Sequence, residues 1–417
     1  MTVTIRVLSP SEHCLSRNDV DPDAIKIISR LHRMGFIAYL CGGAVRDLLL
    51  GRKPKDFDIV TDARPGQIKK RFANVFIIGR RFRLAHVHFP GNKIIEVATF
   101  RRDLTEEESA VPAEKIPPEL LYGTPREDAF RRDVTINALY YDALSGEVID
   151  YAGGIQDLAD RRVRIIGDPA ARFVEDAVRI WRVVRYAARL GFTLEEETAR
   201  AIPTFGPLLG KCAGARLYEE LNKEFVEKTR PVMDALRAHG LLRHILGGFG
   251  EDYENDETLY GRLRGLLDVK DRIQKEGCAL TREEIYGLFF WPWAESFFDG
   301  KDGDMGPVLD RAFESAGTQA VFPRKMRADI VHILTLVARI GKAIQNGRPS
   351  ASLGRQASFA SAFRVYFLIN HGRLPEPEDV PKELFGKPHP HHEEAAPEKK
   401  RRRRPRRRRR TPRPPQG

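Results

Sequence analysis

Two aspartates in the segment Asp56-Phe57-Asp58 are the side chains of this sequence best suited to chemistry. With the apolar residues that follow, they predict a strand over 56–60 whose alternation sends both carboxylates to one face. At roughly 6 to 7 Å and an effective dielectric near 20, the two charges repel by about 2 kcal/mol, so a nearby cation is favoured. Carboxylate oxygens suit Mg²⁺, or Mn²⁺, and triphosphate oxygens would complete the shell. A third acid, Glu96, is expected on another strand, from which it could join them as a metal ligand.

A pair of glycines precedes these aspartates and predicts an anion site. The apolar run 37–41 indicates a buried strand, Gly42 and Gly43 a tight turn, and residues 44–50 a short helix. A helix that starts on such a turn points free N–H groups and its positive dipole end at the turn, which favours phosphate, and Arg46 adds a charged donor. A lone Gly-Gly is usually only a turn and a lone Asp-x-Asp a solvated strand face, but together, in this order, they indicate a metal-dependent enzyme acting on a nucleoside triphosphate.

An arginine ladder on a helix predicted over 175–190 provides a means of reading a base. Arg179, Arg182 and Arg185 recur every three residues beside an apolar stripe, and Asp176 lies one turn before Arg179. Side by side, Asp176 and Arg179 would offer an acceptor and a donor to adenine or cytosine and refuse uracil and guanine, which present a carbonyl there. By itself, such a ladder is more often a helix surface laced with ion pairs.

Five blocks in order over residues 25–230 resemble the class II nucleotidyltransferases, which comprise tRNA CCA-adding enzymes and bacterial poly(A) polymerases: GGAVRD, DFD, RRDVTINALYYD, VIDYAGG and VEDAVRIWRVVRYAARLGF. The resemblance implies an α+β fold, with a polymerase-beta-like α/β head followed by an all-α neck and body. It implies that Asp56 and Asp58 hold two magnesium ions. One would lower the pKa of an RNA 3′-hydroxyl for in-line attack on the α-phosphate, and the other would steady the leaving pyrophosphate.

The same resemblance implies the remaining site residues. Asp133 is counted as catalytic with the two aspartates, because its motif holds the nucleotide sugar and phosphates. An acid and an amide can bond ribose hydroxyls while an arginine pairs with phosphate. The implied nucleotide-binding residues are Gly42, Gly43, Arg46, Arg132, Asn137, Asp176, Arg179, Arg182 and Arg185.

The segment 77–88 favours A addition over CCA addition. Its Gly-Arg-Arg-Phe sequence looks like the poly(A) polymerase branch, and Arg80, Arg81 and Arg83 would add positive charge for RNA of any sequence. The alternative is an ordinary basic loop before a strand.

The C-terminal segment is the second indication. From Lys399 to Arg410 every residue except Pro405 is basic, and Arg413 follows, so that these twelve charges equal the formal net charge of the whole chain, +12. Prolines and like charges predict disorder, and such a tail binds phosphate backbones without sequence preference. Membrane-surface attraction or a partner-binding arm are the alternatives. The expected RNA-binding residues here are Arg401, Arg402, Arg403, Arg404, Arg406, Arg407, Arg408, Arg409 and Arg410.

The chain divides by composition into a leader, a head, a neck, a body and a tail. The predicted ranges are 1–20 for the leader, 21–150 for the head, 151–230 for the neck, 231–375 for the body and 376–417 for the disordered tail. The glycine pair within 151–154 predicts a flexible hinge between head and neck, since paired glycines permit unusual backbone angles. The aromatic cluster at 288–293 could stack RNA bases, but core is the favoured interpretation.

Composition agrees with an intracellular enzyme. The 417 residues are 42% hydrophobic, the four cysteines are scattered without a C-x-x-C pair, and neither a signal peptide nor an apolar run of membrane length occurs. We therefore predict a cytoplasmic, monomeric, template-independent RNA 3′-adenylyltransferase that uses ATP. Its partners would be RNA 3′ ends, of mRNA, other transcripts or tRNA, and RNA-decay proteins. The rival predictions are a CCA-adding enzyme and a non-catalytic RNA-binding scaffold.

Overall fold

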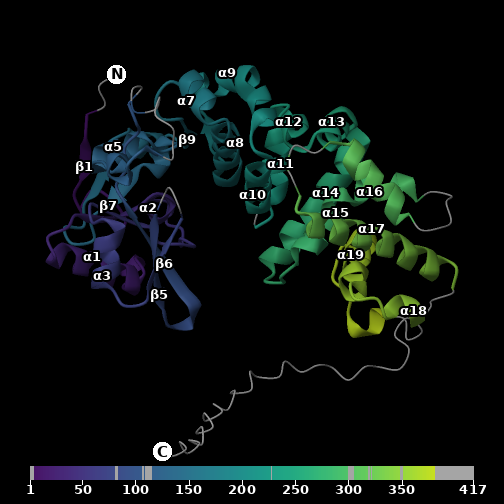
Figure 1. Ribbon diagram of the computed structural model, residues 1–417. Helices are drawn as coiled ribbons and strands as arrows, with labels where there is room; N and C mark the ends of the chain where they lie inside the picture. The colour runs from purple at the N-terminus through teal and green to yellow at the C-terminus, as the bar shows by residue number, and fades with distance from the viewer. Residues whose placement is uncertain are drawn as a thin grey trace, which may run out of the picture.

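The computed structural model describes residues 4–79, 83–105, 108, 115–226, 228–298, 305–317, 320, 322–347 and 351–380. A head built on a β-sheet lies at one end, the neck helices α7 to α10 lie next to it, and helices α11 to α19 continue away from the head as the body (Figure 1). Of the tail predicted over 376–417, residues 381–417 lie outside the described residues, as do Arg80 and Arg81, whereas Pro377–Asp379 form a 3-10 helix. Within the described part, no helix is both long and apolar enough to cross a membrane.

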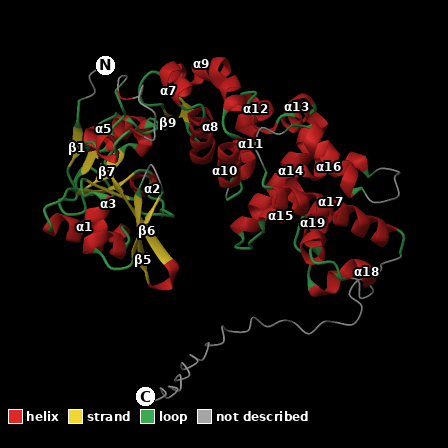
Figure 2. Cartoon of the chain, in the orientation of Figure 1, coloured by secondary structure: helices red, strands yellow, loops and turns green. Residues whose placement is uncertain are grey.

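Eight strands form the sheet of the head (Figure 2). In spatial order they are β1 (Arg6–Leu8), β8 (Val148–Asp150), β7 (Leu139–Tyr141), β2 (Ala38–Cys41), β3 (Ile59–Thr61), β6 (Lys93–Thr99), β5 (Leu84–Phe89) and β4 (Val75–Ile78). All neighbouring pairs are antiparallel except β3 and β6, which are parallel. The strand predicted over 56–60 starts only at Ile59, so both aspartates lie in the loop that enters β3.

Short helices complete the head. They are α1 (Pro22–Arg33), α2 (Gly43–Leu49), α3 (Pro65–Arg71) and α5 (Pro125–Phe130). The apolar positions of α1 recur at helical spacing, and Ala24, Ile27, Ile28 and Leu31 are all buried against the sheet layer. The predicted leader is part of the head, because β1 pairs with β8 and buries Leu8 in the core. The alternation of apolar and polar residues over 3–7 is a strand signal that the prediction of a leader missed.

The neck contains α6 (Gly154–Ala159), β9 (Arg162–Val163), α7 (Pro169–Glu175), α8 (Val178–Leu190), β10 (Thr193–Leu194), α9 (Glu196–Phe205) and α10 (Gly214–Glu224). The single helix predicted over 175–190 is wrong at its start. Asp176 has φ −150° and ψ 94°, which is extended backbone, and it separates α7 from α8. Asp176 and Arg179 therefore do not belong to one continuous helix.

The segment predicted as a hinge is closely held. The buried carboxylate of Asp150 accepts hydrogen bonds from the backbone N–H groups of residues 152, 153, 154 and 155 at 2.9 to 3.1 Å. A Cβ on Gly154 would lie 2.2 Å from the carbonyl oxygen of Thr135, so only glycine fits there. The glycines permit close approach of two backbones at this corner, and the predicted looseness is not what the structure shows.

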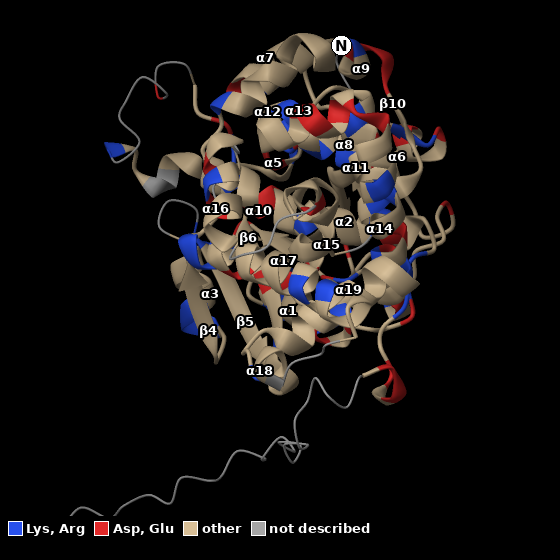
Figure 3. Cartoon of the chain, turned by 90° about the vertical axis from the view of Figure 1, so that its right-hand side faces the viewer, with Lys and Arg blue, Asp and Glu red and all other residues tan. Residues whose placement is uncertain are grey.

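The body is helical throughout its described length. Its helices are α11 (Thr229–Ala238), α12 (Leu242–Leu246), α13 (Gly248–Asn255), α14 (Glu257–Lys275), α15 (Arg282–Ala294), α16 (Gly306–Ser315), α17 (Arg324–Gln345), α18 (Ala351–Gly354) and α19 (Phe359–His371). Phe289 and Phe290 of α15 are fully buried among other aromatic rings, which confirms the core interpretation of that cluster. Basic and acidic residues are interspersed over the neck and body (Figure 3).

Candidate nucleotidyl-transfer site

Three acids meet at the point where β3 and β6 begin to run side by side. Ile59 of β3 pairs with Val97 of β6 in parallel register, which sets Asp58, at the end of the loop that enters β3, beside Glu96 of β6. Asp56, Asp58 and Glu96, with His86 of β5, line a recess of about 330 Å³. The Nε2 atom of His86 lies 3.3 Å from Oε1 of Glu96. The topology of the sheet thus brings the predicted acids to one place.

The electrostatics of the recess oppose negative charge. Protein atoms crowd the carboxylate of Asp58, although the residue still reaches solvent, and the charges of Glu96 and Asp56 add to this effect, so the pKa of Asp58 rises to about 6. A bound cation would relieve that repulsion, and a set of carboxylate oxygens suits Mg²⁺. Among the described residues, no three acidic, histidine or cysteine side chains converge closely enough to enclose an ion alone. Glu96 shares the recess but faces His86. The two aspartates therefore fit an ion whose remaining ligands are oxygen atoms of a bound nucleotide.

The start of α2 forms one side of a second, larger pocket that adjoins the recess at Asp58. Gly42 adopts φ 72°, and a Cβ there would lie 3.2 Å from Nη1 of Arg132. Arg46 donates from Nη1 to Oδ1 of Asn137 at 2.6 Å and from Nε and Nη2 to Asp47 at 2.9 and 2.7 Å. Two residues predicted to contact the nucleotide, Arg46 and Asn137, therefore hold each other beside the glycine turn.

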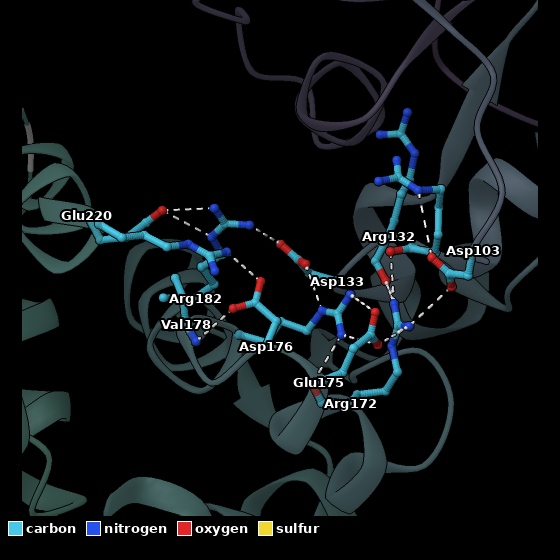
Figure 4. Close-up of polar contacts among 12 residues, drawn as sticks. Asp103, Arg132, Asp133, Arg172, Glu175, Asp176, Val178, Arg182 and Glu220 are labelled. Atoms are coloured by element: carbon cyan, nitrogen blue, oxygen red, sulfur yellow. Dashed lines mark hydrogen bonds and ion pairs between the residues drawn. The ribbon is translucent and has the colours of Figure 1, made fainter. Parts of the chain in front are cut away.

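Asp133 joins the head to the neck (Figure 4). Its Oδ1 accepts from Nε of Arg179 at 3.3 Å, and its Oδ2 accepts from Nη1 of Arg182 at 2.9 Å. Arg182 also donates to Oε1 of the buried Glu220 on α10. The carboxylate predicted to hold the sugar is thus fixed by two arginines of the predicted ladder.

The predicted pairing of the Asp176 and Arg179 side chains is not made, although the backbone N–H of Arg179 donates to the carbonyl of Asp176 at 3.0 Å. Oδ1 of Asp176 accepts from the backbone N–H of Val178 at 3.2 Å, and Oδ2 accepts from Nη2 of Arg216 at 2.5 Å. Arg179 turns toward Glu175 instead, with its Nη1 2.6 Å from Oε2. The cause is the extended backbone at Asp176, which separates α7 from α8 and directs this carboxylate away from α8 and toward α10.

One pocket of about 780 Å³ gathers most of the predicted nucleotide residues. Predicted residues on its wall are Gly42, Gly43, Asp58, Arg132, Asp133, Asn137, Asp176, Arg179 and Arg182. A basic pocket of about 490 Å³ adjoins it at Gly43 and Asp58, and its lining includes Arg46 and Asp56 with the cations Arg52, Lys53, Lys55, Arg189 and Lys228. Phosphate groups could extend from one pocket to the other past the aspartates.

Comparison with known proteins identifies this arrangement. Residues 38–164 match a family model described as "Poly A polymerase head domain", and residues 191–250 match one described as "Probable RNA and SrmB- binding site of polymerase A". The poly(A) polymerase I of Salmonella typhi is 35% identical over 378 residues, which are 86% of this chain and 80% of that protein. This chain belongs to the poly(A) polymerase family. The poly(A) polymerase I of Escherichia coli is 47% identical over 223 residues, 52% of this chain and 48% of the relative.

Poly(A) polymerases share their fold with CCA-adding enzymes, as the resemblance implied. The crystal structure of the Bacillus stearothermophilus CCA-adding enzyme in complex with CTP matches with a TM-score of 0.63 and 28% identity, covering 86% of this chain and 81% of that one. The predicted nucleotidyltransferase head, helical body and family are therefore confirmed.

Arg185, predicted to bind the nucleotide, lines neither the pocket of about 780 Å³ nor the basic pocket beside it. Arg185 is 4% exposed and donates to Glu220 at 2.6 Å and Glu224 at 3.0 Å, between α8 and α10. The bulky Trp181 is accommodated there too, with its Nε1 2.8 Å from Glu224. Arg83 is exposed near the start of β5. The structure thus assigns Arg185 to packing between helices.

Sequence reasoning missed several residues that hold the site. Asp128 is buried and accepts from Nη2 of Arg132 at 3.0 Å, from the Tyr140 hydroxyl at 2.9 Å and from the backbone N–H of Arg101 at 3.1 Å. The signal available was its position four residues before Arg132, one helical turn away. Further unpredicted residues on the pocket wall are Glu175, Tyr186 and Arg216. Arg216 contacts Asp176 from 40 residues away, so no local spacing marks it. Glu175 lies four residues before its partner Arg179, a spacing that could have marked it.

Proposed function

We propose that this protein is a template-independent RNA 3′-adenylyltransferase, which transfers AMP from ATP to the 3′-hydroxyl of RNA and releases pyrophosphate. The observation that carries the proposal is its 35% identity with a poly(A) polymerase I along 86% of this chain. The pocket of about 780 Å³ that reaches Asp58 and is lined by residues of both head and neck is large enough for a nucleotide beside the aspartates. A cytoplasmic location and a monomeric state stay predictions.

Each side chain has a role in this proposal. Asp56 and Asp58 would hold two divalent ions, Mg²⁺ or Mn²⁺, which when bound supply Lewis acidity to the attacking hydroxyl and the leaving pyrophosphate. The N–H groups at the start of α2, where Gly42 and Gly43 line the pocket, would bind phosphate oxygens of the nucleotide. Asp133 keeps Arg179 and Arg182 on the neck side of the pocket, where their charge offsets that of the nucleotide. Asp128 keeps Arg132 against the glycine turn.

CCA addition to tRNA is the second candidate, because a CCA-adding enzyme shares the fold at a TM-score of 0.63. Incubation of the full chain and Mg²⁺ with each nucleoside triphosphate in turn separates the two. We expect long A tracts from ATP on an unstructured RNA. A product that stops after C-C-A, formed only on tRNA lacking its terminus, would replace the proposal with the rival.

The variant Asp58→Ala tests the metal assignment within this function. We expect incorporation to fall at least about a thousandfold, as loss of electrostatic stabilisation at the reacting phosphate predicts, with an unchanged circular dichroism spectrum. Glu197→Ala, an exposed acid on α9, is the matched control and should keep full activity. Near-normal turnover of the Asp58 variant with Mg²⁺ would refute the assignment.

A further inference from the structure

One face of the strands β4, β5 and β6 is open to solvent and leads away from the catalytic aspartates. Side chains along these strands alternate between two faces. One face is buried in the core and meets α3, whereas the other carries Phe76, Ile78 and Ile94, which are 57%, 47% and 46% exposed. Contiguous exposed apolar surface marks a site of interaction, whereas single exposed side chains are ordinary. We call this second surface the open face.

The strand register makes the open face continuous with the catalytic recess. Phe76 pairs with His86, and His86 pairs with Glu96. The register of β3 and β6 continues this row from Glu96 to Asp58. Since neighbouring strands are about 4.8 Å apart, Phe76 of β4 lies about 14 Å from Asp58. A stacked single strand covers that distance with about four nucleotides.

The open face offers an aromatic ring and flanking cations. The ring of His88 meets that of Phe76 edge to face, with centroids 4.9 Å apart, and His88 pairs with Ile94, so the apolar surface extends to β6. Arg71, four residues before β4, and Arg83, immediately before β5, are both exposed. Nucleobases of any identity stack on aromatic rings, and cations attract the phosphates between them. This combination suits single-stranded RNA.

The direction of the reaction favours the same surface. The two pockets and the recess all reach Asp58. The basic pocket, which suits pyrophosphate, includes the start of α2, which packs on β2 and β7 to one side of β3, whereas the recess lies at β6 and β5 on the other side. The attacking and leaving oxygens are roughly in line across the reacting phosphorus. The RNA hydroxyl is therefore expected from the recess, where the open face begins.

We propose that the open face holds the last nucleotides of the acceptor RNA, with one base stacked on Phe76 and the 3′-hydroxyl in the recess beside Asp58. The inference rests on the proposed adenylyltransferase function and deepens it by naming the surface that receives the RNA. Stacking accepts every base, as addition of AMP to RNA ends of different sequence requires.

The test removes one ring from the protein and one base from the RNA. Primers carry a single abasic residue at each of the last five positions in turn. We expect an abasic residue at one of these positions to raise the wild-type KM for primer about 10-fold, the value of one lost base–aromatic stack. Phe76→Ala should raise the KM for intact primer by a similar factor and be insensitive to that abasic residue, because both changes remove the same contact. Its KM for ATP should be unchanged, since Phe76 does not line the nucleotide pocket.

Matched variants separate stacking from general damage. Phe76→Trp keeps an aromatic ring and should retain the wild-type values, and Phe76→Leu keeps apolar area without a π-face and should be intermediate. Leu144→Ala removes a side chain that is 48% exposed between β7 and β8 and should change neither KM. An unchanged KM for primer in Phe76→Ala, or an abasic penalty that persists there at every position, overturns the inference. Loss of self-association in Phe76→Ala with primer binding unchanged also overturns it, and would assign the open face to a second copy of the chain.

Failure of the proposed function is a separate outcome. If wild-type protein incorporates no AMP on any primer, that function fails. The same primers, labelled and read by fluorescence anisotropy without ATP, then still test the open face, because the abasic penalty on binding should disappear in Phe76→Ala and persist in Leu144→Ala.

Discussion

The surroundings of Asp58 disfavour its negative charge. The charged carboxylate therefore lowers the stability of the metal-free protein, although the proposed function needs it to bind a cation. Crowding around the carboxylate and the charges of Glu96 and Asp56 raise its pKa from 3.8 to about 6. Between these pH values the folded protein holds a proton that the unfolded chain has lost, so stability falls as pH rises through this range and the full cost is present above pH 6. Sites of this kind are typical of functional rather than structural residues.

We predict that Asp58→Asn stabilises the metal-free protein at pH 7.5. The gain is about 1 kcal/mol once solvent contact at the carboxylate is allowed for, or about 2 °C in the melting midpoint. At pH 5, between the unfolded pKa of 3.8 and the folded pKa of about 6, the folded protein has to hold a proton that the unfolded chain has lost, so the gain should fall to about half. Thermal melts in EDTA at both pH values measure this, with the exposed Glu197→Gln as a control of no effect. Equal midpoints for the variant and the wild type at pH 7.5 would contradict the electrostatic account.

At the scale of elements, the contact between α8 and α10 fixes the neck side of the site. Glu220 is buried and bonds both Arg182 and Arg185, while Arg182 also reaches Asp133 of the head. Burial alone would raise the pKa of Glu220, but the charges of Arg185 and Arg182 hold it at about 2. The helix pair thus has a charged seam that extends to the pocket.

We predict that Glu220→Gln lowers the free energy of unfolding by about 2 to 3 kcal/mol at pH 7, because it leaves the buried guanidinium of Arg185 and the partly buried one of Arg182 short of a negative partner. The contribution of a carboxylate with a lowered pKa is fully present above its unfolded value of 4.5 and is lost as pH falls toward about 2. Urea unfolding at pH 7 and pH 3 should therefore show a smaller difference from wild type at pH 3. Glu219→Gln, the exposed neighbour on α10, should be neutral at both. A constant difference at both pH values would mean that packing, not charge, is lost.

How far the elements follow from sequence depends on the range of the forces that form them. The glycine turn at Gly42 and the aspartates before β3 follow from local patterns, and the structure brings them together where the sequence predicts. The interruption of the helix at Asp176 does not follow from the sequence. The apolar pattern continues through this position, and the ion pair of Asp176 is with Arg216, 40 residues away. The burial of Arg185 between α8 and α10 does not follow from the sequence for the same reason, since its acidic partners lie 35 and 39 residues further on.

At the scale of the whole molecule, the charge balance predicts that the C-terminal residues are a second contact for RNA. The chain has a formal net charge of +12, and residues 399–417 contain twelve basic residues and no acid, so the remainder is balanced. On the side of the molecule that faces the viewer in Figure 3, basic and acidic residues both occur. Phosphate contacts made by these residues release counterions, and binding becomes steeply dependent on salt.

We predict that deletion of residues 399–417 weakens binding to an unstructured RNA and flattens its salt dependence. If about half of the twelve charges contact phosphate, the slope of log K against log salt should fall by about 4 for a single strand. Fluorescence anisotropy with a labelled oligonucleotide over a salt series measures both quantities. A variant of full length with these arginines replaced by serine should behave like the deletion, whereas an arginine-to-lysine variant should behave like wild type, because the term depends on charge and not on side-chain shape. Incorporation of AMP on a primer of a few nucleotides, too short to reach a distant segment, should change little. An unaltered slope in the deletion would assign RNA affinity to the neck and body, whose charges are balanced, and would leave the basic residues to another partner.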